Sequence, residues 1–169
     1  MIRATLIALL LLATPAFAQE HEDDHGEHAE EYHDEHVAEL DGLRAIHAWA
    51  RATSSSTAQV FVALENTGED AVTLRGGEAE IAATVTLVGF QLVGGESAYV
   101  ALPEMPIPAG REIVLAPNGL ALELAGLTRP LVQGEHFEME IEFDTGHLEI
   151  VVEIESATAT QHSHAGHNH

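Results

Sequence analysis

The chain has no cysteine and no lysine among its 169 residues. Without cysteine it can form neither a disulfide framework nor a thiolate site for a metal ion. The same absence argues against a lipid-anchored N-terminus of the bacterial lipoprotein kind. The sequence also lacks a Gly-x-Ser-x-Gly motif and a compact Ser/His/Asp set, so we predict that the protein is not an enzyme.

Basic residues are scarce, and acidic ones are abundant. Six arginines stand against 28 Asp and Glu residues, which gives a formal net charge of −22. A surface of this charge repels nucleic acid and anionic lipid but attracts cations. We therefore exclude nucleic acid as a partner and expect a metal ion.

Long apolar runs are missing beyond the N-terminus. Ala4–Ala13 is almost wholly apolar but too short to cross a bilayer. Arg3 precedes this run, and Ala16-Phe17-Ala18 follows as a small-x-small cleavage site. We expect residues 1–18 to be a cleaved signal peptide, and the mature protein to lie in the periplasm without a membrane span.

Histidines gather in two polar tails, an acidic one over residues 19–42 and a second over 157–169. The tails hold nine of the twelve histidines: His21, His25, His28, His33, His36, His162, His164, His167 and His169. Imidazole is the commonest protein ligand of zinc, copper and nickel. Because neither tail can bury a core, we expect both to be flexible and to bind metal. The alternative is a solvated acidic tail in which histidine is incidental.

Residues 43–156 consist of short β-type segments separated by turn residues. The expected strands are Ala45–Ala52, Thr57–Glu65, Ala71–Arg75, Ile81–Val88, Ser97–Leu102, Arg111–Leu115, Leu120–Ala125, His136–Phe143 and His147–Ile154. The last two alternate apolar and polar residues on either side of Asp144-Thr145-Gly146, as an antiparallel hairpin does. So many short strands predict an all-β sandwich with Greek-key connections.

Several motifs in this region resemble the periplasmic copper chaperone family PCu(A)C. They include Ala48-Trp49-Ala50-Arg51-Ala52-Thr53, Phe61 to Gly68, Ile107-Pro108-Ala109-Gly110, Leu115 to Leu120, and Pro130 to Gly134. Their order and spacing span about residues 43–155. The resemblance implies a cupredoxin-like β-sandwich and a role in copper delivery.

The family's copper ligands are absent from this chain. The family binds Cu(I) through His-x10-Met-x21-His-x-Met, and the Asn118-Gly119-Leu120 landmark fixes the register of that pattern. The four ligand positions then fall on Val88, Tyr99, Ala121 and Glu123. None has the required side chain, so the resemblance implies a divergent member whose original site is degenerate.

The remaining candidate ligands in this region are few. We expect Met139 to lie in the core, Met105 to pack in a loop, and Trp49 to pack in the sandwich. His47, His136 and His147 stand alone at strand starts and are expected to be ordinary exposed histidines.

Together these observations predict a periplasmic metallochaperone that captures and hands over an ion through its tails. Nitrogen and oxygen ligands favour Cu(II) over Cu(I), with Zn(II) as the alternative. The other hypothesis is a metal-independent interaction or assembly module that docks on a membrane-bound metalloprotein or transporter. A membrane-bound partner of that kind could also receive the ion.

Overall fold

The computed structural model describes residues 37–163, and every regular element in this range is a β-strand. No helix that could cross a membrane is found among these residues. The strands are β1 (Val37–Leu40), β2 (Leu43–Arg51), β3 (Thr57–Asn66), β4 (Val72–Glu78), β5 (Thr84–Val93), β6 (Glu96–Ala101), β7 (Met105–Ile107), β8 (Arg111–Leu115), β9 (Leu120–Ala125), β10 (His136–Phe143) and β11 (Gly146–Glu155).

All nine expected strands are present, and β8, β9 and β10 have the expected bounds. Two further strands were not expected. β7 is a three-residue strand in the proline-rich loop, and β1 lies within the segment expected to be a flexible tail. β1 pairs with β2 along its whole length. The two strands are joined by a two-residue turn, Asp41-Gly42, in which both residues have positive φ. An Asp-Gly turn of this kind is a strong hairpin signal.

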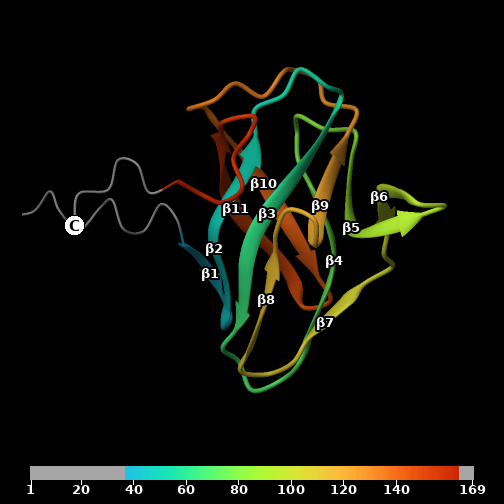
Figure 1. Cartoon of the computed structure of the whole chain (residues 1–169). Helices are drawn as coiled ribbons and strands as arrows, with labels where there is room; N and C mark the ends of the chain where they lie inside the picture. The colour runs from blue at the N-terminus through green and yellow to red at the C-terminus, as the bar shows by residue number, and fades with distance from the viewer. Residues whose placement is uncertain (1–36, 164–169) are drawn as a thin grey trace, which may run out of the picture.

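The strands form one continuous hydrogen-bonded sheet that closes on itself. Its closed path runs β5-β9-β3-β2-β11-β10-β4 and returns to β5, where Gly77 of β4 pairs with Val85. Figure 1 shows β2, β3, β8 and β9 in front of β10, β11 and β4. Most neighbours are antiparallel, but β2 and β11 run parallel, and so do β8 and β9 where Leu115 pairs with Leu120. The expected all-β sandwich is confirmed.

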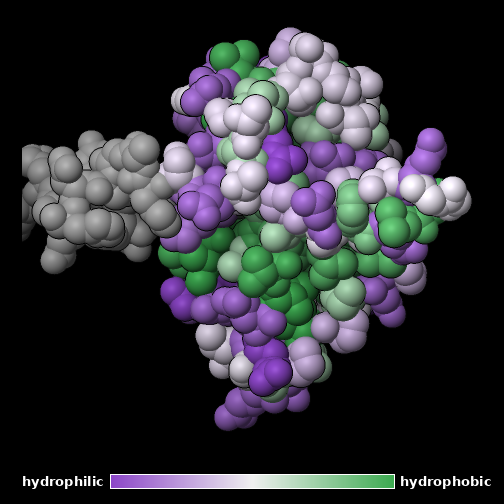
Figure 2. All heavy atoms as spheres, in the orientation of Figure 1, coloured by the Kyte–Doolittle hydropathy of each residue, from purple (hydrophilic) through white to green (hydrophobic). Residues whose placement is uncertain are grey.

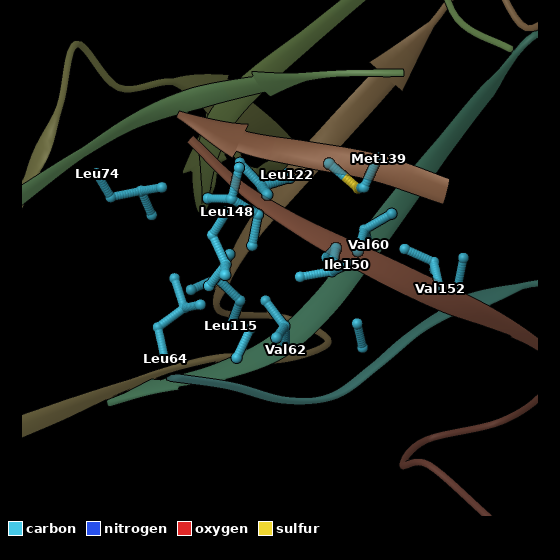
Figure 3. Packing of buried hydrophobic residues seen from close by; sticks show 14 of the residues in the cluster. Val60, Val62, Leu64, Leu74, Leu115, Leu122, Met139, Leu148, Ile150 and Val152 are labelled. Carbon is cyan, nitrogen blue, oxygen red and sulfur yellow. The ribbon is translucent and has the colours of Figure 1, made fainter. Parts of the chain in front are cut away.

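The core lies between these layers and is aliphatic for the most part (Figure 3). In β10 the predicted alternation holds, because Phe137, Met139, Ile141 and Phe143 are all buried while Glu138 is exposed. Each fully buried side chain of this size stabilises the fold by about 2 kcal/mol. Met139 is 3% exposed, in agreement with its predicted place in the core.

Apolar residues also reach the outer face of the front layer. Ile46, Ala63 and Val114 are cross-strand neighbours on β2, β3 and β8, and Val114 is 54% exposed. Figure 2 shows apolar surface on this face, with hydrophilic surface around it. The outer face of the sandwich is therefore not uniformly acidic, despite the large net charge.

Gly77 is needed where β4 joins the ring. A Cβ at this position would lie 2.4 Å from the carbonyl oxygen of Glu140 on β10, so the strands would have to separate. We expect Gly77→Ala to lower the free energy of unfolding in urea by about 1–3 kcal/mol. Gly89→Ala is the matched control, because its Cβ would meet only the flexible side chain of Leu102, at 3.2 Å. Equal effects of the two variants would contradict this account.

Asp144 ties the β10–β11 turn to β4 and makes the fold sensitive to pH. Its carboxylate accepts a hydrogen bond of 2.8 Å from the backbone N–H of Thr73. This hydrogen bond lowers the pKa of Asp144 below its usual 3.8. The stabilisation is therefore complete above the unfolded-state pKa and is lost as pH falls through the folded-state pKa.

We accordingly expect Asp144→Ala to lower the melting temperature at neutral pH. The difference from the unmodified protein should shrink as pH falls below about 4, when the carboxylate is protonated in both states. Thermal unfolding followed by circular dichroism at several pH values measures this difference. A difference that stays constant down to about pH 2 would show that the carboxylate charge does not matter.

Candidate metal centres

Of the nine tail histidines, only His162 lies within the described residues. The other eight are outside them: His21, His25, His28, His33, His36, His164, His167 and His169. Their proposed metal-binding role therefore stays a prediction. His162, in contrast, has a defined place against the sandwich.

Three of the four family ligand positions come together in the fold. Val88 of β5 and Ala121 of β9 are direct cross-strand partners, and both are buried. They form a small apolar cluster with Trp49 of β2 and Phe61 of β3, and Tyr99 packs against it. We call this group the outer apolar cluster, because Ala48 and Ala50, which flank Trp49, belong to the main core instead.

The chemistry of this cluster excludes the family's copper site. Val88 and Ala121 supply no ligand atom where the family has imidazole. Tyr99 offers, in place of a thioether, only a phenol oxygen, which accepts a hydrogen bond of 3.2 Å from the Asn118 N–H. Glu123, the fourth position, accepts a hydrogen bond of 3.0 Å from the Gln59 amide. The Trp49 ring lies 4.7 Å from the Phe61 ring, measured between centroids and tilted by 47°, so Trp49 packs within the fold as predicted, though on the outer side of β2. Three of the ligand positions inferred from the resemblance thus lie close together, and the space where a copper ion would bind is filled by apolar packing.

The chain after β11 folds back over this cluster. Ala159 packs on it, and the Ala159 carbonyl oxygen accepts a hydrogen bond of 2.6 Å from Nε of Arg51. The Arg51 guanidinium also lies 5.7 Å from the centre of the Phe61 ring. Figure 1 shows this C-terminal segment returning beside β2 and β11. Residues 157–163, which the sequence places in a flexible tail, therefore lie against the domain.

The return of the chain buries His162 beside two carboxylates of β11. His162 is 8% exposed, and its Nε2 lies 2.9 Å from Oε2 of Glu153. Glu155 is 9% exposed and accepts hydrogen bonds from the backbone N–H and the hydroxyl of Ser163, at 2.8 and 3.0 Å. One ligand atom from each of Glu153, Glu155 and His162 lies within 4.8 Å of the others. We call these three residues the Glu-His cluster.

A second imidazole borders the Glu-His cluster. The ring of His47 lies 4.9 Å from the ring of His162, measured between centroids and tilted by 49°. His47 sits at a β-bulge in β2. Ile46 pairs with Ala63 of β3 and Trp49 with Phe61, so two residues of β2, His47 and Ala48, lie opposite the single residue Val62 of β3. The His47 φ of 51° is in the left-handed region, where His is enriched among non-glycine residues.

Sequence reasoning missed this pairing, and the expectation that His47 is an isolated histidine at a strand start is wrong. His47 lies in the middle of β2, is half-buried and contacts His162. The bulge shows as a change in the two-residue period of the core-facing side chains of β2. Leu43 and Ala45 face the core, and after them Ala48 and Ala50 face it instead of residues 47 and 49. The contact itself joins residues far apart in sequence and could not be read from spacing.

Other candidate ligands are dispersed. His136 is exposed, and His147 lies 3.6 Å from Glu140 at the opposite end of the β10–β11 hairpin. Met105 is half-buried in β7. A groove of about 890 Å³ between β4, β10 and β11 has Glu78, Glu138 and Glu149 in its lining, but none of its described lining residues is a histidine.

Comparison with known proteins agrees with this architecture. The family model named LpqE-like matches residues 43–154. "Putative lipoprotein Lxx21020" from Leifsonia xyli subsp. xyli (strain CTCB07) is 30% identical over 111 residues, which cover 64% of this chain. The chain spans 66% of the length of that relative.

Solved structures with a similar fold include copper-bound proteins. The copper-bound PCuAC domain from PmoF2 has a TM-score of 0.61 and 19% identity, covering 72% of this chain and 98% of its own. The Cu(I) form of DR1885 from Deinococcus radiodurans has a TM-score of 0.54 and 22% identity, covering 72% and 80%. These likenesses confirm the expected cupredoxin-like sandwich. The chain thus belongs to the LpqE-like family, and its sandwich has the fold of PCuAC domains.

Proposed function

We propose that this protein is an exported metal-binding protein that captures copper, or zinc, and hands it on to an acceptor. One observation carries the proposal. The sandwich has the fold of copper-bound PCuAC domains, yet none of the four family ligand positions holds His or Met, while nine histidines lie at or beyond its ends. In this chain, metal binding then depends on those nine histidines instead of the four ligand positions that bind copper in the family.

The ligand types favour a divalent ion. The tails offer imidazoles and carboxylates but no sulfur, which suits Cu(II) and Zn(II) better than Cu(I). Cu(II) binds such sites most tightly by the Irving–Williams order, so supply in the cell decides which ion is carried. Ligands that do not form a closed shell also allow exchange, which transfer to an acceptor requires.

The proposed location is the cell envelope or beyond it. The relative's name is that of a lipoprotein, which supports a secreted or envelope protein, and the signal-peptide pattern of residues 1–18 agrees. In that compartment the receiver of the ion is a membrane-bound metalloprotein or transporter. The solved structures with this fold include a copper-bound PCuAC domain and the Cu(I) form of DR1885, which favours this role over catalysis.

The tails are tested by replacing eight histidines in the full chain with glutamine and keeping His162. The replaced residues are His21, His25, His28, His33, His36, His164, His167 and His169. We expect the number of Cu(II) or Zn(II) ions bound at neutral pH to fall, because most imidazole ligands are gone. Native mass spectrometry with titration calorimetry measures the number. As a control, His136→Gln with His147→Gln should change nothing. Unchanged stoichiometry in the eight-residue variant would exclude the tails as the binding region.

The degenerate site is tested by restoring the family ligands. Val88→His, Tyr99→Met, Ala121→His and Glu123→Met together place imidazole and thioether at the four positions. We expect this variant to gain one Cu(I) ion in competition with a Cu(I)-specific chelator, whereas the unmodified sandwich gains none. The larger side chains overpack the outer apolar cluster, so stability falls by about 1–3 kcal/mol. A folded variant that gains no Cu(I) would show that the inferred register is wrong.

A further inference from the structure

We propose that the Glu-His cluster is a divalent-cation site distinct from the family's copper position. Its ligands are Glu153, Glu155 and His162, from the end of β11 and the segment that folds back over it. The inference rests on the proposed function only for the identity of the ion, Cu(II) or Zn(II). The site itself follows from the geometry of residues that the structure describes.

The spacing of the ligand atoms suits a small cation. Zn(II) binds imidazole nitrogen and carboxylate oxygen at about 2.0–2.2 Å, so tetrahedral ligand atoms stand about 3.4 Å apart. In the Glu-His cluster the atoms lie within 4.8 Å of one another, and Nε2 of His162 is 2.9 Å from Oε2 of Glu153. An ion can therefore enter after that pair opens by about half an ångström and Glu155 turns slightly inward.

Electrostatics also favours a cation at this point. Glu153 and Glu155 are two residues apart on one strand, so their carboxylates project from the same face of the sheet. Glu155 is 9% exposed, and burying a carboxylate is costly unless its charge is compensated. The hydrogen bonds from Ser163 orient Glu155 but bring no positive charge. A divalent ion would neutralise both carboxylates at once.

Surrounding groups hold the ligands in place, as outer-shell contacts do in metal sites. Arg51, the parallel partner of Glu155 in β2, binds the carbonyl of Ala159 and so fixes the returning chain. Ser163 fixes the Glu155 carboxylate. His47 packs on the His162 ring and limits its orientation, which makes His47 a positioning residue.

Ligand type and number point to a borderline ion that can be exchanged. One nitrogen and two oxygens, with no sulfur, suit Zn(II) and Cu(II) and disfavour Cu(I). Three protein ligands leave at least one coordination position open. An acceptor could use that position to bind the ion before the protein releases it, as transfer by ligand exchange requires.

The site is tested in the full chain that carries the eight tail substitutions and retains His162. Zn(II) and Cu(II) are titrated separately by calorimetry, and the Cu(II) complex is examined by electron paramagnetic resonance. We expect one ion per chain and a Cu(II) spectrum with coordinated imidazole nitrogen. Adding Glu153→Gln or Glu155→Gln should weaken binding at least tenfold, because glutamine keeps a hydrogen-bond acceptor but removes the charge. His162→Gln should abolish the nitrogen signal.

The matched control is Glu149→Gln, which changes an exposed carboxylate on the same face of β11. It should leave affinity unchanged. Two results would overturn the site. One is that the eight-substituted chain binds no ion, and the other is that Glu153→Gln and Glu155→Gln leave the affinity for the ion unchanged. A different result would contradict the proposed function: the eight substitutions would leave the number of bound ions the same as in the unmodified chain. Circular dichroism confirms that each variant is folded.

Discussion

The β-bulge at His47 is the constraint on which the outer face of this protein depends. Side chains of a strand alternate between faces, so one extra residue exchanges the faces of everything after it. Without the bulge, the inward set that begins with Leu43 and Ala45 would continue through Trp49 and Arg51. With it, Ala48 and Ala50 enter the core instead. Trp49 is then free to build the outer apolar cluster, and Arg51 to hold the C-terminal segment.

The outer apolar cluster lies where the resemblance places three of the family's copper ligands. Val88 and Ala121 are buried next to Trp49 and Phe61, so the area used for ligands in the family contributes here to apolar burial. Burial of this kind stabilises by about 25 cal/mol per Å² of apolar surface removed from water. Ala159 completes the burial, which couples packing of the cluster to the position of the returning chain. The Glu-His cluster exists because that chain is held in place.

Local pattern was sufficient to predict most of the sandwich. The β10–β11 hairpin follows its alternation residue by residue, since one face is buried and the other is wet. β1 was missed because its acidic surroundings suggested disorder, although Asp41-Gly42 marks a tight turn. β7 is short and contains Pro106, which argues against a strand.

The candidate site was harder to predict than the fold. Two of the ligand positions that the resemblance implies, Val88 and Ala121, are cross-strand partners in the structure. The Glu-His cluster could not be found in this way. It requires His162, which composition assigns to a flexible tail, to return beside the end of β11, and the neighbouring His47 is placed by a bulge in β2. Both depend on contacts between distant parts of the chain.

The positions of the first and last described residues have a consequence for avidity. Val37 is paired with Ile46, next to His47, and His162 packs on His47 itself. Figure 1 accordingly shows both ends of the described chain on the same side of the sandwich. The sequences that carry the remaining eight tail histidines are thus tethered at neighbouring points. If the tails bind metal as proposed, ligands tethered so closely act at an effective concentration on the order of millimolar, and an ion released by one tail meets the other before it diffuses away.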